Sequence, residues 1–302
     1  MPDRLESLLV GKQAGWWLPV GGGALHCQPD TDGLPSGPAC TFLYPDLNTA
    51  LHGHWEAGRL AGAAPGRLVG LDTTGPLPRP LVELESGTGQ VYRQEVSTAV
   101  LVAELPLLED PYEQRTVYVA ESGQAGAGEG LFLKRDLAPG DLAALYNGAR
   151  LSESESRLRA EDRRSPYRLQ GWAGTVLNIP PTARLTSQYR ASLAHKANHD
   201  KRPNAEYRLL EHPRWGRIVG LYMLQPGKAG QEILVDYGYT EKYLATQAGM
   251  QFMLQAAQLL GGYEDKMEFK HEMKRTIGFV REKISDLKPF IHTFKLAKNF
   301  IS

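Results

Sequence analysis

The sequence predicts a mainly β protein in three parts: β-hairpin repeats at the N-terminal end, a second β domain, and a helical C-terminal segment. Residues 11–105 are rich in glycine, proline and short β-prone runs. Residues 114–240 hold short strand-like runs between Pro, Gly and Asn turns. In residues 241–302 apolar positions recur at helical spacing with few helix breakers at first.

Two stretches of the first part predict hairpins. They are GWWLPVGGGALHC at 15–27 and TFLYPDLNTALHGHWEAGRLAG at 41–62. Each places β-prone runs on both sides of turns that carry glycine. The second stretch also spaces aromatic and glycine residues regularly, which indicates small hairpin repeats. These positions are Tyr44, Gly53, Trp55, Gly58 and Gly62.

The second part is expected to contain many short strands and little helix. Strand candidates lie at 116–122, where apolar and polar residues alternate, and at 216–224 and 232–239, which are apolar and β-branched. Short helices are expected at 151–164 and 188–197. The strands therefore dominate this region, and turns of Pro, Gly and Asn connect them.

The third part favours helices. Residues 241–261 have helical spacing, and residues 264–287 keep an apolar stripe that Pro289 ends or kinks. We expect a packed or partner-binding helix here. The alternative is a helix on a membrane surface, because residues 264–302 are mildly basic.

The composition excludes several classes of protein. Lys+Arg and Asp+Glu both total 34 in 302 residues, so no global field attracts nucleic acid, and we expect no direct nucleic-acid binding. Two cysteines cannot form a disulfide framework or a four-cysteine zinc site. The first residues do not resemble a signal peptide, and no apolar run reaches the ~20 residues of a membrane span. We therefore expect a soluble, intracellular monomer.

The glycine-rich stretch at 125–141 invites a phosphate-loop hypothesis. Gly126, Gly128 and Gly130 would let the backbone approach a ligand closely. No Gly-Lys-Ser/Thr follows, and the helix and distant acid of a dinucleotide site are missing. Taken alone, the stretch favours a tight turn.

The segment HKANHD at 195–200 invites a metal hypothesis. His195 and His199 are four residues apart, as in helical zinc proteases, but the glutamate that serves there as general base is absent. Lys196 would also place a cation beside the metal. The residues favour histidines with structural hydrogen bonds, and we predict no metal site. Taken alone, DYGY at 236–239 is an edge-strand aromatic pair.

Four separated motifs keep a characteristic order and spacing. They are GEGLF at 128–132, YNG at 146–148, NHDKRPN at 198–204 and YGY at 237–239. This set resembles the SET domain of protein-lysine methyltransferases. Longer stretches at 44–62, 105–122 and 189–218 are similar to histone-lysine methyltransferases that carry MORN hairpin repeats before the SET domain. The resemblance covers roughly residues 14–240.

The resemblance implies that the cofactor is S-adenosylmethionine. It assigns backbone contacts with the methionine part to Ala127, Gly128 and Glu129, and places Asn198 and His199 at the adenosine. It also implies that the Asn-His and Tyr-Gly-Tyr segments cross in a knot-like arrangement, an exception to the rule of unknotted connections.

Four tyrosines match the lysine channel of that family: Tyr146, Tyr207, Tyr237 and Tyr239. Methyl transfer from a sulfonium to a neutral amine is an in-line displacement that needs positioning more than an acid. Tyrosine rings suit this chemistry because they pack on the lysine stem while their hydroxyls orient the amine. Tyr237 is the expected central catalytic residue. Hydroxyls at Tyr146 and Tyr207 would crowd a methylated amine, so we predict mainly monomethylation.

The resemblance implies the histone H3 tail and other lysine-bearing proteins as substrates. It further implies action in the nucleus, on chromatin, and also in the cytoplasm. The alternative is a SET and MORN scaffold with little turnover that binds partners. A third hypothesis, a membrane-associated repeat protein, rests on the hairpins and the basic tail alone.

The sequence departs from the family pattern in three places. Position 200 is Asp where the family usually has Ser, and we expect this to tune cofactor affinity. Residues 153–178 are only loosely similar, which affects the groove for the substrate peptide. No Trp matches the aromatic residue expected to cover adenine after Tyr239, so Tyr243 or Phe252 is the candidate substitute.

Overall fold

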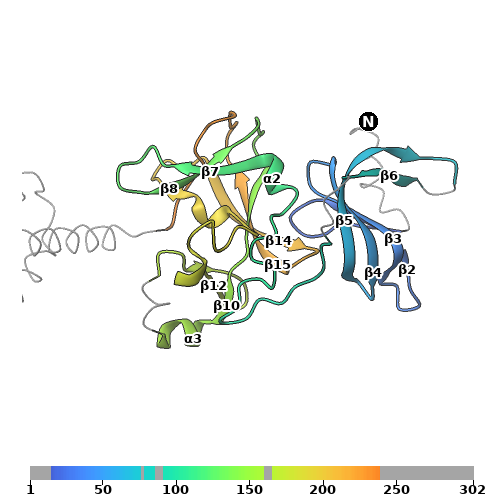
Figure 1. The fold of residues 1–302 in the computed structure, drawn as a ribbon, viewed down its shortest axis with the longest axis horizontal. Coiled ribbons are helices and arrows are strands. Elements are labelled where there is room, and N and C mark those ends of the chain that lie inside the picture. The colour runs from blue at the N-terminus through green and yellow to red at the C-terminus, as the bar shows by residue number, and fades with distance from the viewer. Residues whose placement is uncertain (1–14, 76–77, 86–90, 160–164, 239–302) are drawn as a thin grey trace, which may run out of the picture. The chain divides into compact units, whose positions relative to one another are not determined.

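The computed structural model describes residues 15–75, 78–85, 91–159 and 165–238 (Figure 1). Contacts divide the chain into two compact units, Met1–Asp236 and Tyr237–Ser302, and only the first two residues of the second unit are described. Tyr239 and the helices expected beyond it lie outside the described residues. Within the described residues, strands dominate, as the sequence predicts. None of the helices found there is long and apolar enough to cross a membrane.

The N-terminal part is one antiparallel sheet of six strands in sequence order. The strands are β1 Trp16–Trp17, β2 Ala24–Pro29, β3 Pro35–Leu43, β4 Thr49–Glu56, β5 Arg59–Asp72 and β6 Arg79–Leu84. Both predicted hairpin stretches are confirmed as strand–turn–strand units. Gly53 shows why glycine recurs here, because a Cβ on it would lie 2.2 Å from the carbonyl oxygen of Gly62 on β5.

A disulfide joins Cys27 on β2 to Cys40 on β3. Both cysteines are buried, and the bridge lies where the register of this strand pair shifts. The sequence excluded a framework of several disulfides, but this single disulfide was not predicted. It links two neighbouring strands of the hairpin sheet, so it closes only a short loop.

The remaining described residues form three small sheets: β10–β12–β11, β13–β16–β14–β15–β9, and β7–β8. Their strands are β7 Val117–Glu121, β8 Glu129–Leu133, β9 Leu142–Tyr146, β10 Ala149–Ser152, β11 Leu169–Gln170, β12 Thr175–Asn178, β13 Asn198–His199, β14 Ala205–His212, β15 Gly216–Met223 and β16 Leu234–Val235. The helical elements are α2 Glu113–Thr116, α3 Glu153–Leu158, η1 Pro181–Ala183 and η2 Ala194–Lys196.

Strand β16 lies between β13 and β14 and runs parallel to both. Asn198 and His199 thereby sit directly beside Leu234 and Val235. Asn204 completes this pairing with its side chain, since its Nδ2 donates to the Glu232 carbonyl at 2.8 Å and its Oδ1 accepts from Leu234 N at 2.8 Å. Distant motifs therefore meet in one sheet. The knot-like crossing itself stays a prediction.

The expected strands at 116–122 and 216–224 are confirmed as β7 and β15. Of the expected strand at 232–239, only β16 is regular in the described part. Of the helix expected at 151–164, only Glu153–Leu158 is helical, as α3, which begins with a capping box between Ser152 and Glu155. Residues 160–164 lie outside the described residues. The helix expected at 188–197 is wrong, because only the 3-10 turn η2 forms there.

Candidate active site

Residues 122–130, called the glycine loop below, are joined to Asn198 by Glu232. The Glu232 carboxylate accepts hydrogen bonds from Ser122 Oγ at 2.7 Å, Gly123 N at 3.1 Å and Asn198 Nδ2 at 3.1 Å. A Cβ on Gly130 would lie 2.4 Å from the same carboxylate. Glycine at this position therefore allows a close approach rather than only a turn. Nothing local in the sequence pointed to Glu232, whose partners lie far away along the chain.

Asn198 holds the loop through a second contact as well. Its Nδ2 donates to the Glu129 carbonyl at 3.1 Å. The His199 carbonyl accepts from Gln124 Nε2 at 3.1 Å, and His199 Nδ1 lies 3.2 Å from the Val235 carbonyl. These contacts join the loop that carries Ala127, Gly128 and Glu129 to Asn198 and His199, through the Glu129 carbonyl and the Gln124 side chain.

The loop itself is open to solvent and unusually shaped. Ala127, Gly128 and Glu129 are exposed, and Gly126 and Gly128 have φ angles of +77° and +74°. A Cβ on either glycine would meet nothing within 4 Å. Glycine is therefore needed here for its backbone conformation and not to avoid a clash with another described residue.

Two of the four predicted tyrosines come together from β9 and β14, the two strands that pair with β15. The rings of Tyr146 on β9 and Tyr207 on β14 have centroids 5.9 Å apart and stand at 90°. The Tyr146 hydroxyl donates to the Tyr167 carbonyl at 2.6 Å, and Tyr146 is buried. Tyr237 directly follows Asp236 at the start of the second unit, and Tyr239 lies outside the described residues. The grouping of all four tyrosines stays a prediction.

His195 lies among aromatic rings. Its ring centroid is 6.4 Å from that of Tyr146, 6.1 Å from Tyr167 and 5.6 Å from Tyr189. Burial, and then the charge of Lys196, lower the pKa of His195 to about 3, so its imidazole is neutral at physiological pH. In the described residues, no three His, Cys, Asp or Glu side chains gather in a way that would hold a metal ion.

Lys196 connects the two halves of the site. Its side chain is buried, and Nζ donates to Glu129 Oε2 at 2.6 Å and to the Arg184 carbonyl. The Arg184 guanidinium lies over the Tyr167 ring, 5.5 Å from the centroid. Because the Tyr167 carbonyl binds Tyr146, one chain of contacts runs from the glycine loop to the tyrosine pair.

Glu113 joins two backbone segments of the site by hydrogen bonds. Its fully buried carboxylate accepts from Leu145 N on β9 at 2.7 Å and from Leu193 N, just before η2, at 3.0 Å. Burial, reinforced by Asp110, raises the pKa of Glu113 well above its ordinary value. One carboxyl group therefore joins the strand that carries Tyr146 to the segment that leads to Asn198.

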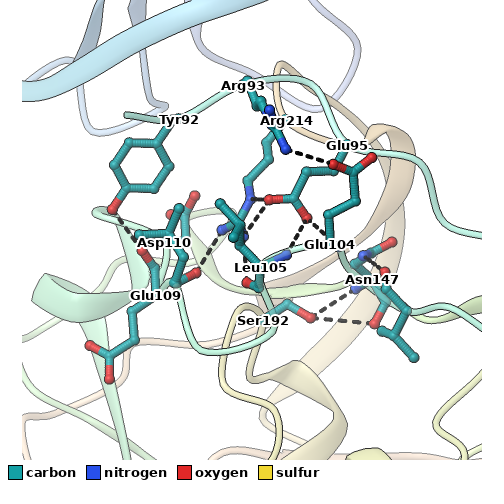
Figure 2. Close-up of polar contacts among 12 residues, drawn as sticks. Tyr92, Arg93, Glu95, Glu104, Leu105, Glu109, Asp110, Asn147, Ser192 and Arg214 are labelled. Carbon is teal, nitrogen blue, oxygen red and sulfur yellow. Dashed lines mark hydrogen bonds and ion pairs between the residues drawn. The ribbon is translucent and has the colours of Figure 1, made fainter. Parts of the chain in front are cut away.

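Residues 91–112, called the linker below, are held in place by polar contacts (Figure 2). Arg214 is fully buried, pairs with Glu95, and donates to the carbonyls of Leu105 and Leu108 at 2.9 and 2.6 Å. Asn147, the neighbour of Tyr146, donates from Nδ2 to the Val102 carbonyl at 2.8 Å. The linker is thus attached directly to the strand end that bears Tyr146.

Asp200 has a local structural role. Its Oδ1 accepts from Arg202 N at 2.7 Å, which forms an Asx turn, and its own N–H donates to the Val235 carbonyl at 3.0 Å. A serine makes the same kind of turn more weakly. The substitution therefore keeps the turn after β13, and an effect on cofactor affinity stays a prediction.

Comparison with known proteins identifies the fold of this region. Residues 128–238 match the family model for the SET domain. Over 219 residues the chain is 34% identical to the histone-lysine N-methyltransferase SETD7 of Halocynthia roretzi. The aligned region covers 72% of this chain and 56% of that protein. The chain thus spans little more than half the length of this relative.

Similarity to solved structures is more distant. One is an active polycomb repressive complex 2 in the basal state, with a TM-score of 0.34 and 23% identity over 41% of this chain and 15% of that one. Another is a humanized mutant of the Chaetomium thermophilum complex bound to the inhibitor GSK126, with a TM-score of 0.33, 23% identity and the same coverage. The family match and the SETD7 alignment carry the assignment: this chain is a SET-domain protein that resembles the histone-lysine N-methyltransferase SETD7.

Proposed function

We propose that the protein is an S-adenosylmethionine-dependent protein-lysine N-methyltransferase that mainly monomethylates histone H3 and other lysine-bearing proteins. The observation that carries the proposal is the contact chain from the glycine loop and Asn198 through Lys196 to Tyr146. It links the residues expected at the cofactor to tyrosines expected at the lysine. We further propose action on chromatin in the nucleus, and also in the cytoplasm.

The residues present fit the proposed cofactor. Ala127, Gly128 and Glu129 are exposed among the described residues, so their backbone polar groups are accessible for contacts to an amino-acid moiety. Asn198 and His199 are fixed by Glu232 and Val235, so they are oriented before a ligand binds. When bound, S-adenosylmethionine supplies the methyl group on its sulfonium.

The tyrosines account for the acceptor side of the proposed reaction. The edge-to-face pair of Tyr146 and Tyr207 offers apolar ring surface to the lysine stem. A lysine amine with a reference pKa of ~10.4 must lose its proton to attack, and a site with little water favours the neutral form. The Tyr207 hydroxyl would orient that amine and limit room for a methylated one. We assign the central position to Tyr237.

Transfer of radiolabel from S-adenosylmethionine to recombinant histone H3, or to a cell lysate, tests the proposal. The wild type should label a protein lysine. The His199→Ala variant should lose most labelling with a large rise in cofactor KM, whereas Arg93→Leu, a linker surface variant, should match the wild type. If the wild type labels nothing in either sample and binds no cofactor by calorimetry, the protein is a SET and MORN scaffold instead.

A further inference from the structure

The charge distribution around Tyr167 is the feature that the proposed function leaves unused. Tyr167 binds the Tyr146 hydroxyl through its carbonyl, so its flanks lie beside the proposed lysine channel. Two arginines adjoin it. Arg168 is the next residue, and the Arg184 guanidinium lies over the Tyr167 ring. The two arginines therefore come from separate segments of the chain, and the Arg184 guanidinium lies against the Tyr167 ring.

Neither arginine is neutralised by a carboxylate in the described part of the chain. Arg168 donates from Nε to Ser156 Oγ at 2.9 Å, and this serine is uncharged. Arg184 makes no side-chain hydrogen bond within the described residues, although its Nε is buried. Both side chains are half-buried, so solvent screens their charge less than at an open surface.

Three acidic residues on β8 and α3 have other partners. Glu129 pairs with Lys196, Glu153 pairs with Arg157, and Glu155 closes the capping box of α3. Within the described residues, which leave out Glu161 and Asp162, neither arginine beside Tyr167 therefore has a paired carboxylate. A positively charged peptide, such as a tail dense in lysine and arginine, would meet like charges there.

We propose that Arg168 and Arg184 make the protein select lysines that are flanked by acidic residues. The proposal rests on the proposed methyltransferase function, because it places the target lysine beside Tyr146. Half-buried guanidinium groups without acidic partners suit Asp and Glu carboxylates, to which arginine donates charge-assisted and often bidentate hydrogen bonds. Histone H3 would then be a weaker substrate than a protein with acidic sequence around the lysine.

Peptides that differ only beside one lysine, with Asp/Glu, Ala or Lys/Arg flanks, provide the test. With the full chain, acidic flanks should raise kcat/KM about three- to tenfold over alanine flanks. High salt should reduce the difference, since screening weakens charge pairing. Arg168→Glu and Arg184→Glu should each reverse the preference, and the milder Arg168→Gln and Arg184→Gln should abolish it. Arg93→Glu, a charge reversal in the linker, should retain it.

The outcomes separate this proposal from the proposed function. Equal rates with acidic and basic flanks in an active wild type would overturn the selection of acidic sequence while leaving the methyltransferase intact. A rise in cofactor KM in Arg184→Gln with unchanged flank preference would overturn it too, because the arginine would then bind the cofactor carboxylate. If the wild type methylates no peptide and no lysate protein, the proposed function itself is wrong.

Discussion

Glu232 offers the sharpest test of how the cofactor half of the site is held together. Its carboxylate accepts three hydrogen bonds, from Ser122 Oγ, Gly123 N and Asn198 Nδ2. The Glu232→Ala variant removes all three while the backbone pairing of β7 with β8 stays in place. The glycine loop and Asn198 would then keep one direct contact, between Asn198 Nδ2 and the Glu129 carbonyl.

The size of the effect follows from these contacts. Buried hydrogen bonds to charged groups contribute about 1.5–3 kcal/mol each, and partial exposure reduces this to about 1 kcal/mol for each bond that orients Gly123 or Asn198. Losing both should weaken S-adenosylmethionine binding by about 2 kcal/mol, or about 30-fold. Glu232→Gln keeps one carbonyl acceptor, so about a fivefold loss is expected.

Isothermal titration calorimetry with S-adenosylmethionine measures this directly. Glu211→Ala is the matched control, because Glu211 is a glutamate paired with Arg217 at the protein surface. It should bind the cofactor like the wild type. A Glu232→Ala dissociation constant within about twofold of the wild-type value would refute the idea that this carboxylate orients the cofactor residues.

Three further predictions follow from the same structure. Tyr207→Phe should raise the share of dimethyllysine seen by mass spectrometry, because it removes a hydroxyl that limits space; an unchanged ratio would count against the assignment. Arg214→Leu leaves the buried Glu95 carboxylate without its partner and should lower the free energy of unfolding in urea by about 3–5 kcal/mol. The surface variant Arg93→Leu should lower it by under ~1 kcal/mol. Equal losses in the two variants would contradict the burial argument. The lowered pKa of His195 means that the unfolded chain binds its proton more readily, so its stabilisation is present above pH 6.5 and is lost as the pH falls toward 3. Between neutral pH and about pH 5, the free energy of unfolding should therefore fall by about 2 kcal/mol less in His195→Asn than in the wild type. An equal fall in both proteins would show that the His195 ring is not buried in its neutral form.

The parts of the fold that depend on local rules could be predicted from the sequence. The hairpins at 15–27 and 41–62 formed as expected, because glycines at their turns and close approaches fix the chain within a few residues. Likewise, the alternation in residues 116–122 predicted β7 correctly.

The helix expected at 188–197 failed for a tertiary reason. The N–H groups of Arg190 and Ala191 donate to the Pro106 carbonyl, and Leu193 N donates to the buried Glu113 carboxylate. Partners from distant segments thus replace the carbonyls of a regular helix. Tertiary contacts of this kind override helix propensity, and no local pattern reveals them.

The site was predictable as a set of motifs but not as a network. The ordered motifs pointed to Gly128, Asn198 and Tyr146. The structure joins Asn198 through Glu232 to Ser122, whose N–H donates to the Gly128 carbonyl. Neither Glu232 nor Glu113 stood out in the sequence, because each acts on residues far along the chain. The cysteine pair was also missed, since its bridge depends on the register of β2 and β3.

The most direct test of the central claim is mass spectrometry of lysine-containing substrates after incubation with S-adenosylmethionine, comparing the wild type with Tyr237→Phe at equal cofactor occupancy. We predict monomethyllysine with the wild type and a large loss of product with Tyr237→Phe, although this variant should still bind the cofactor. Equal product from both proteins would contradict the assignment of Tyr237. Cofactor binding by the wild type without any methylated lysine, in H3, acidic peptides or lysate, would contradict lysine methyl transfer as the function of this site.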